Sequence, residues 1–569
     1  MKIGDLPVKQ RKAIRAWCMF DWANSAFATS GIAAIYPIYF VTLFKDSVGE
    51  NAELFGFVFT GSSMWSLSVA ASTAIVAVTS PLLGIVADRI PIKKTLLWAY
   101  TIVGAFFSVM AFFATYTPVP WVFLLATFIF ANLGFAGGLV FYNAFLPHIA
   151  PKQLLDDVSS RGFAYGYVVG GLLLLIHLVM NLIFSESDLL DFVTRLSMAS
   201  IGIWWVLWSL WTMKVLEEPE IINPKSGLTV KKATNLAFKE IGNTFREIKK
   251  FRVVLVYLVA YLIFNDGIQT VMGIAGAFAA DTLGLALVFN MATILIIQFV
   301  AAGGSMFFSR LAQAVSTKKA LSISLVGWVF IVIMGVSVSP LAPNAHERYD
   351  YQLEYNQQTL NYLVAEAPKL EETERNRPWI TKTGNINQGD RLTIRSASTL
   401  TDTVKEFPRA RHSLSINGGP LDGVPPIGML HPSSLGKGPL DWWPSTVRNV
   451  LWAPLNLDAG FQWLILGVCV GLVMGGSQAL SRSLFAQIVP ETRSSEFFSF
   501  FGFMSRASSV IGPMLFILVT GVIDQRTAVF SIVILIIIGT ALLKGVNVES
   551  GIKIAQTEDE TMRSQTTSE

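Results

Sequence analysis

The chain has 569 residues, of which 52% are hydrophobic and only 14% are charged, and its mean hydropathy is +0.52. Soluble globular domains carry about 25% charged residues, so this balance excludes an ordinary water-soluble protein and indicates one with lipid as its solvent. The formal net charge of +4 is too small to predict a nucleic-acid partner, and two cysteines, Cys18 and Cys469, exclude a disulfide framework.

Twelve long apolar segments follow one another along the chain. A bilayer core of about 30 Å needs about 20 apolar helical residues to cross it. The segments lie near residues 14–44, 57–87, 95–115, 120–148, 160–184, 191–214, 253–280, 284–312, 319–338, 460–489, 496–523 and 527–546. This pattern predicts an all-α membrane protein with twelve transmembrane helices, arranged as six plus six.

Basic residues in the short loops predict the orientation of these helices. They gather in the N-terminal arm (Lys2 to Arg15), after the second segment (Arg89 to Lys94), in the central connection (Lys231 to Arg252) and after the eighth segment (Arg310 to Lys319), whereas the alternate loops are acidic or neutral. We therefore expect both termini in the cytoplasm. No Asn-x-Ser/Thr sequon occurs, which favours the cell membrane of a bacterium over a glycosylated vacuolar membrane.

Two long segments lie outside the helical pattern. Residues 217–252 are basic and helix-prone, and residues 339–459 are polar and rich in proline and glycine, which predicts an extracytoplasmic insertion between helices 9 and 10. The insertion is either a small domain or a long ordered loop, with a strand-like piece at Arg391 to Ile394 and an interfacial aromatic pair, Trp442-Trp443. The expected units are an N-terminal bundle (1–216), a cytoplasmic linker (217–252), a C-terminal bundle (253–546) interrupted by 339–459, and a disordered cytoplasmic tail (547–569).

Three short similarities indicate an internal repeat. The matching pairs are Ala87–Lys94 with Ala312–Lys319, displaced by 225 residues, Asn143–Pro151 with Arg482–Pro490, displaced by 339, and Phe20–Asp21 with Asn265–Asp266, displaced by 245. The displacements 339 and 225 differ by 114 residues, about the length of the insertion. Two pseudo-symmetric six-helix halves, one of them interrupted, account for all three matches.

Several motifs resemble a known family. The loop from Gly84 to Lys94 resembles the glycine–aspartate–basic signature of the major facilitator superfamily, with Pro91 where that signature usually has glycine. Four further stretches are similar to its vacuole-effluxer-like branch, which includes autophagy-related vacuolar amino-acid effluxers of fungi and many bacterial permeases: Phe20–Thr29, Val158–Gly171, Gly475–Pro490 and Glu496–Pro513. The resemblance implies the major facilitator fold and export of small solutes, with amino acids as the class documented for the fungal members.

Polar side chains inside the spans are candidates for substrate binding or coupling, because an unpaired polar group in lipid is costly. The resemblance implies that helices 1, 4, 7 and 10 line a central cavity. The candidates on these helices are Asp21, Trp22, Asn24, Ser25, Tyr142, Asn143, Asn265, Asp266, Gln269, Gln478, Ser481 and Arg482. Asp21 and Asp266 are suited to bind an ammonium group or to carry a proton, and Arg482 to bind a carboxylate; the alternative for the two carboxylates is a structural pairing with Arg161 or Arg482.

A second group of residues is interpreted as a conformational latch. Its members are Gly84, Asp88, Arg89, Lys93, Lys94, Arg161 and Glu496, with Arg506 as a further partner. A carboxylate at Asp88 is placed to cap the start of a neighbouring helix and so favour one access state. The alternative is that the charged residues of this loop only determine the orientation of the helices in the membrane.

Two other patterns predict packing rather than chemistry. Gly162, Gly166 and Gly170 form one face of helix 5, which predicts a close approach of another helix. Four tryptophans of helix 6 are expected to face lipid and the membrane interface: Trp204, Trp205, Trp208 and Trp211.

The sequence lacks a G-x-x-x-x-G-K-[ST] loop, a His-Glu-x-x-His motif and a G-x-S-x-G elbow. It therefore predicts no enzyme, no cofactor and no metal site. We expect a monomeric secondary active transporter that moves a small polar solute, with amino acids as the first class to test and protons as the coupling ion. A non-transporting sensor whose insertion binds a partner stays open as the alternative.

Overall fold

The structure, a computed structural model, describes residues 2–49, 51–54, 57–221, 251–285, 287–370, 376–436 and 438–567. Within these ranges, twelve helical segments are long and apolar enough to cross a membrane, from Val8–Val48 to Gln525–Lys544. The predicted number of spans is thus confirmed for the described part of the chain. Most of the predicted linker 217–252, including its basic residues from Lys231 to Lys250, lies outside the described residues.

The first half of the bundle contains six spans. After the 3-10 turn η1 (Ile3–Asp5), the first span combines α1 (Val8–Ala26), the π-helix η2 (Phe27–Ile35) and α2 (Tyr36–Val48). Two short antiparallel strands, β1 (Asn51–Leu54) and β2 (Phe57–Thr60), lead into the second span. The other spans are α3 (Gly61–Ala87), α4 (Lys93–Met110) with η3 (Ala111–Tyr116), α5 (Pro120–Ala144) with α6 (Leu146–Ile149), η4 (Lys152–Leu154) with α7 (Leu155–Ile183), and α8 (Leu190–Val215).

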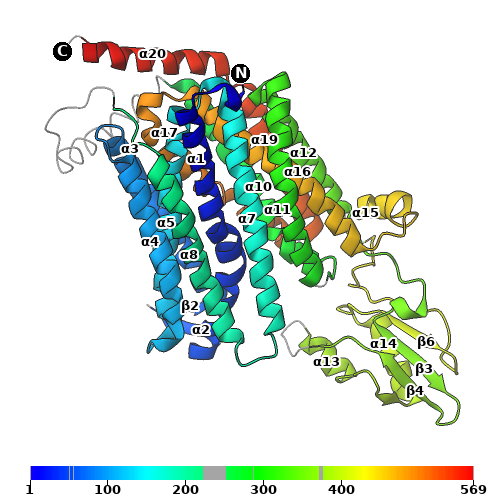
Figure 1. Cartoon of the computed structure of the whole chain (residues 1–569). Coiled ribbons are helices and arrows are strands. Elements are labelled where there is room, and N and C mark those ends of the chain that lie inside the picture. Colours follow the sequence, from blue (N-terminus) through cyan, green and yellow to red (C-terminus); the bar gives the residue numbers. More distant parts are fainter. Residues whose placement is uncertain are drawn as a thin grey trace.

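The second half contains the other six spans and ends in a further helix. Its spans are α10 (Arg252–Asp281), α11 (Leu287–Val315), α12 (Thr317–Ser337), α16 (Ala459–Ile488), η7 (Glu491–Arg493) with α17 (Ser494–Ala507) and α18 (Ile511–Val522), and α19 (Gln525–Lys544). The final helix, α20 (Val548–Thr567), lies across the end of the bundle at which both chain termini are found, here called the terminal end (Figure 1).

The tail was expected to be disordered, and this prediction is wrong. Helix α20 is amphipathic: Gly551, Ala555 and Asp559 are buried against the bundle while Lys553 and Gln556 are exposed. The helix packs against α16 and η7. The high proportion of charged residues in this segment concealed a narrow row of buried residues at helical spacing. Contact of this row with the bundle stabilises the helix.

The halves share one apolar core, to which the first half contributes residues from its terminal-end part. This core includes Trp17 and Phe141 of the first half together with Tyr257 and Phe485 of the second. Between the halves, α7 packs against α11 and α16, and α17 packs against α3 and α5. A separate core, which includes Phe27, belongs to the first half alone. Cohesion between the halves is therefore concentrated near the terminal end.

Trp205 corrects the prediction for helix 6. It is only 1% exposed and stacks on Phe27 at 5.6 Å between ring centroids, whereas Trp211 is 44% exposed. Trp204, Trp208 and Trp211 share one helical face by their spacing of four and three residues, and Trp205 lies about 100° away from that face. It therefore points into the first half instead of towards lipid.

The insertion is a small domain with its own core. Its sheet has the order β5-β4-β3-β6, in which β3 (Tyr351–Asn356) is antiparallel to β4 (Asn361–Glu366) and parallel to β6 (Leu414–Asn417). The remaining elements are η5 (His346–Arg348), α13 (Arg377–Thr383), β5 (Arg391–Leu392) and α14 (Ile394–Glu406). The predicted strand 391–394 is limited to two residues because Thr393 caps α14, which begins at Ile394. The domain lies at the opposite end of the bundle from α20, the insertion end (Figure 1).

Both ends of the insertion are attached to the second half. Gln462 at the start of α16 donates to the carbonyl of Ser339 at 3.0 Å and accepts the N–H of Ser339 at 3.1 Å. Arg448 donates to the carbonyls of Pro340 and Ser433 at 3.2 and 2.9 Å. Between the sheet and α16 lie α15 (Trp442–Val447) and the π-helix η6 (Arg448–Trp452), and α15 packs against α12.

Candidate functional site

A buried ion pair joins the halves in the part of the bundle towards the terminal end. Asp21 lies on α1 and Arg482 on α16, and the Asp21 Oδ2 atom accepts hydrogen bonds from Arg482 Nη1 and Nη2, both at 3.3 Å. Tyr142 of α5 donates its hydroxyl to the same oxygen at 2.7 Å. Asp21 is 6% exposed and Arg482 3% exposed, so these donors replace the water that the carboxylate would bind in solution.

The other hydrogen bonds that Arg482 makes within the described chain also cross to the first half. Its Nε donates to Ser159 Oγ at 3.0 Å, its Nη2 to the Ser159 carbonyl at 2.7 Å, and its Nη1 to Asn143 Oδ1 at 3.3 Å. The guanidinium carbon lies 4.1 Å from the ring centroid of Phe163 and 4.7 Å from that of Trp17. Arg482 therefore fastens the second half to the first.

The position of Asp21 follows from the close approach of α1 to α7. A Cβ atom on the glycines of α7 would lie 2.5 Å from Asp21 Oδ2 at Gly162 and 2.6 Å from Thr29 Oγ1 at Gly170, and it would overlap Ser25 Oγ at Gly166. The predicted packing role of this glycine face is confirmed. The side chains of Asp21 and Ser25 thus lie in the contact between two helices.

The remaining candidates on α1 and α16 differ in how their polar atoms are paired. Gln478 accepts a hydrogen bond from the Tyr167 hydroxyl at 2.5 Å. By contrast, Asn24 Nδ2, Trp22 Nε1 and Ser481 Oγ are buried and have no hydrogen-bond partner among the described residues. Buried polar atoms usually have partners, so these three atoms stay candidates for substrate binding.

Asp266 corresponds to Asp21 in the repeat, but its contacts are different. Its Oδ2 accepts the N–H groups of Ile511 and Gly512 at 3.0 and 3.1 Å, which are the first residues of α18. Asp266 therefore caps the second piece of the broken eleventh span. The adjacent Asn265 donates to Ser508 Oγ just before that helix, and Gln269 is partly buried one turn further along α10.

An apolar cavity of about 320 Å³ lies in the insertion-end part of the second half. Its walls come mainly from α10, α11 and α16, with Met272, Ile297 and Trp463 among the lining residues, and Ala33 of η2 borders it from the first half. Asn290 and Thr293 of α11 are polar side chains in its wall.

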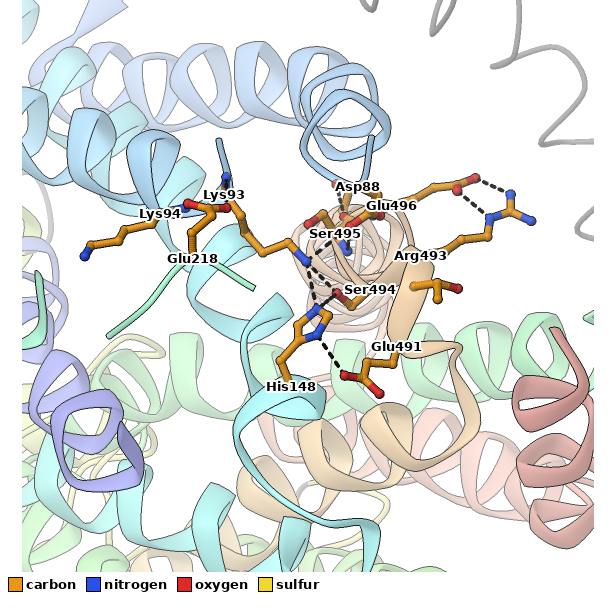
Figure 2. Close-up of polar contacts among 12 residues, drawn as sticks. Asp88, Lys93, Lys94, His148, Glu218, Glu491, Arg493, Ser494, Ser495 and Glu496 are labelled. Atoms are coloured by element: carbon orange, nitrogen blue, oxygen red, sulfur yellow. Dashed lines mark hydrogen bonds and ion pairs between the residues drawn. The ribbon is translucent and has the colours of Figure 1, made fainter. Parts of the chain in front are cut away.

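At the terminal end, residues predicted to form the latch lie at contacts between the halves, which Figure 2 shows. Asp88 follows α3, and its two carboxylate oxygens accept the N–H groups of Ser495 and Glu496 in the first turn of α17 at 3.1 and 2.8 Å. Lys93 Nζ lies 3.3 Å from Asp88 Oδ1. Asp88 thus caps a helix of the opposite half, as expected.

Lys93 extends this contact through His148, which the sequence analysis did not include in the site. Its Nζ donates to His148 Nε2 and to Ser494 Oγ, both at 2.9 Å. Lysine has only donors, so His148 Nε2 is the acceptor and the proton resides on Nδ1, which donates to Glu491 at 3.1 Å. The chain of contacts Lys93–His148–Glu491 crosses between the halves (Figure 2).

Glu218 is a further latch residue that the sequence analysis placed in the linker. Its carboxylate oxygens accept the N–H groups of Lys93 and Lys94 at 2.7 and 2.8 Å and so cap α4 (Figure 2). Burial raises the pKa of Glu218, and the two N–H bonds together with the lysine charges oppose this rise. Lys94 contributes to the latch through its backbone.

The other predicted latch residues have more local contacts. A Cβ at Gly84 would lie 2.7 Å from the Ser495 carbonyl oxygen, so glycine allows α3 to touch α17. The Glu496 side chain pairs with Arg493 of its own half at 2.8 Å, and Arg161 pairs with Asp157 of its own helix at 3.0 Å. Arg89 is partly buried beside Asp88, and Arg506 donates across the halves to the Ala136 carbonyl at 2.6 Å.

A second set of polar contacts joins the halves at the same end. Asp156 of α7 accepts hydrogen bonds from Thr317 Oγ1 at 2.7 Å, from Gln487 Nε2 at 3.3 Å and from Ser483 Oγ. Gln487 follows His148 by 339 residues, the displacement of the internal repeat. The repeat thus produces two related latches, one containing His148 and the other Gln487. His148 could have been predicted from the sequence by comparing the two copies of the repeat.

Helix α20 contacts the latch that contains Asp88, Lys93, His148 and Glu491. Asp559 accepts the N–H groups of Glu491 and Thr492 at 3.1 and 3.0 Å and the Thr492 hydroxyl at 2.8 Å. Arg563 lies 3.4 Å from Glu491, the residue to which His148 donates. Among the described residues, no group of His, Cys, Asp and Glu side chains is arranged to hold a metal ion.

Twelve spans in two halves, joined by a buried ion pair and by polar latches at one end, form a membrane protein with the major facilitator fold. The chain belongs to the vacuole effluxer Atg22-like family, whose sequence pattern matches residues 9–341 and 449–556. The unmatched residues between these ranges contain the sheet of the insertion domain. The predicted family and helical membrane fold are confirmed.

Relatives and solved structures agree with this assignment. The chain is 23% identical over 554 residues to the uncharacterized MFS-type transporter YxiO of Bacillus subtilis (strain 168), covering 96% of this chain and 98% of the relative. It is 21% identical over 614 residues to autophagy-related protein 22 of Candida glabrata, covering 96% and 92%. The proton:xylose symporter XylE bound to 6-bromo-6-deoxy-D-glucose shares the fold with a TM-score of 0.52 at 11% identity and 95% coverage of each chain. The E. coli fucose:proton symporter FucP has a TM-score of 0.51 at 9% identity, covering 94% and 98%.

Proposed function

We propose that the protein is a secondary active transporter that exports a small zwitterionic solute, with amino acids as the substrate class, by alternating access. The observation that carries this proposal is the buried Asp21–Arg482 pair, in which an acid of one half meets a base of the other inside the bundle. A carboxylate and a guanidinium are the two groups that complement the ammonium and carboxylate of an amino acid.

The basic loops assign the terminal end to the cytoplasm, so the polar latches close the cytoplasmic side. Rocking of the halves has to break the contacts of Asp88 with α17 and of Asp156 with Thr317 before a solute passes in this direction. A solute that competes for Asp21 and Arg482 weakens the ion pair between the halves. The solute thereby shifts the equilibrium from the closed to the open state, and the size of the shift equals the difference between its binding free energies to these two states.

Asp21 is the proposed coupling residue. Protonation of Asp21 removes the charge that holds Arg482 and so releases the second half from α1. Asp266 is assigned a structural role, because its carboxylate caps α18 through two N–H groups. An asparagine at position 266 retains an oxygen that accepts an N–H bond, whereas an asparagine at position 21 removes the charge from the ion pair.

The test is counterflow of a labelled amino-acid panel in proteoliposomes containing the full chain. Wild type is expected to show specific counterflow that responds to a pH gradient, Asp21→Asn to lose the pH response, and Asp266→Asn to retain it. Specific counterflow also excludes a non-transporting sensor. Absence of counterflow for every amino acid would overturn the substrate class, and an undiminished pH response in Asp21→Asn would overturn the role of Asp21.

A further inference from the structure

The segment between the insertion sheet and α16 exposes large apolar side chains. Trp442 of α15 is 63% exposed, Val450 of η6 is 73% exposed and Leu455 in the following turn is 58% exposed. These residues are close together in the chain, and none belongs to the core of the insertion domain, which includes Tyr351. An apolar surface of this kind on a short helical element marks an interaction site.

Arg448 and Thr446 of this segment, and Asp441 just before it, form hydrogen bonds within the protein. Arg448 donates to the carbonyls of Pro340 and Ser433. Asp441 Oδ2 accepts the N–H group of Gly438 at 3.0 Å, and the Thr446 hydroxyl donates to the Trp442 carbonyl at 2.7 Å. Lipid contact therefore leaves these groups with partners.

A contact with α12 sets the depth of the segment. Trp443 Nε1 donates to the carbonyl of Ile333 at 2.8 Å. Ile333 lies four residues before the end of α12 at Ser337, so at a rise of about 1.5 Å per residue the contact is about 6 Å inside the end of this membrane-spanning helix. Figure 1 shows α15 projecting from the side of the bundle, apart from the strands of the insertion domain.

The neighbouring surface of α16 is also apolar. Phe461 and Ile465 are 54% and 44% exposed, one turn apart at the start of this span, and Val468 continues the same face at 44%. The exposed side chains of the segment are thus followed in the chain by an exposed apolar face of a membrane-spanning helix. Asn449 and Asn456 are exposed beside them, which suits the boundary between acyl chains and headgroups.

We infer that residues 442–457 form an interfacial anchor whose apolar face inserts into the outer leaflet of the bilayer. The acyl chains of that leaflet cover Val450 and Leu455, and the exposed Trp442 lies at the boundary between acyl chains and headgroups. The insertion domain is thereby held at the membrane surface beside the outer end of the second half. Its position no longer depends only on the two chain connections to α12 and α16.

The test uses spin labels on the full chain in liposomes. Cys18 is buried, so replacing Cys469 with serine leaves Val450→Cys or Leu455→Cys as the site of labelling. Phe330→Cys on α12 is the lipid-facing control, and Val424→Cys in the insertion domain, where Val424 is 91% exposed, is the aqueous control. Collision rates with oxygen and with a water-soluble nickel chelate report the depth of each label.

Labels at 450 and 455 are expected to give an oxygen-to-nickel collision ratio close to that at 330 and several-fold above that at 424. A ratio close to that at 424 would overturn the anchor, because the segment would then be in water. Low collision rates with both reagents, together with dipolar coupling between labels on different molecules, would also overturn it, because a second copy of the chain would then cover this face.

Discussion

Replacement of Asp88 with alanine should open the terminal end of the bundle. The Asp88 carboxylate accepts two N–H bonds from the first turn of α17 and lies 3.3 Å from Lys93, which is 3% exposed. In the closed state, alanine leaves these N–H groups without an acceptor and removes one of the partners of the buried lysine. In the open state, water reaches the same groups. The substitution therefore destabilises the closed state selectively.

The expected magnitude follows from the bonds that are lost. A hydrogen bond to a charged group contributes about 1.5–3 kcal/mol, and water recovers part of this in the open state, so the two bonds of Asp88 together correspond to a shift of about 3 kcal/mol. This is about a 140-fold change in the ratio of open to closed molecules, since about 1.4 kcal/mol is a factor of ten. A population that is about 99% closed would become about 40% closed.

The assay is a pulsed electron-resonance distance measurement across the terminal end. Labels on Thr95 of α4 and Lys319 of α12, both exposed, report the separation of the halves once Cys469 is replaced. Asp88→Ala is expected to add a population at longer distance. Asp88→Asn, which keeps one acceptor oxygen, is expected to add a smaller one.

Asp157→Ala is the matched control. Asp157 forms an ion pair with Arg161 on its own helix, so loss of this ion pair does not affect the contact between the halves. Its distance distribution should equal that of the wild type. If Asp88→Ala folds and retains a wild-type distance distribution, the capping bonds do not hold the halves together, and the latch is wrong.

Three further predictions concern other contacts. Gly84→Val should lower the melting temperature of the purified protein, because the new Cβ would lie 2.7 Å from the Ser495 carbonyl oxygen and such overpacking costs about 1–3 kcal/mol. The control, Gly335→Val, places its Cβ in open space and should lower the melting temperature less. Asp559→Ala removes the hydrogen bonds that hold α20 on η7, and it should increase the long-distance population in the same pulsed measurement. An unchanged distance distribution would mean that α20 does not stabilise the closed state. Burial raises the pKa of Asp350, but bonds from His431 and Ser413 outweigh this and hold its pKa below the ordinary value. The stability that this pairing contributes is present above the unfolded pKa of about 3.9 and is lost as pH falls through the lowered folded pKa. Tryptophan fluorescence of the insertion domain should therefore change only below about pH 4, and His431→Ala should move that change to higher pH.

The number of membrane spans, the two halves and the insertion could be predicted from the amino-acid sequence, because lipid imposes a minimum apolar length on every helix that crosses it. The sequence also identified Asp88 as a cap, since the glycine before it and the basic residues after it lie within one short loop. These features depend on residues that are near one another in the chain. Local spacing is enough to identify them.

Tertiary structure decided which polar residues meet. Asp21 and Asp266 are equivalent in the repeat, yet one pairs with Arg482 and the other caps α18. The partner of Asp21 is 461 residues away, and no periodicity specifies a contact at that separation. The same holds for His148 and Glu491 and for the docking of α20. In a buried site, each polar group bonds to whatever donor or acceptor the packed helices bring within reach, so the helix arrangement, and not the local sequence, selects the partner.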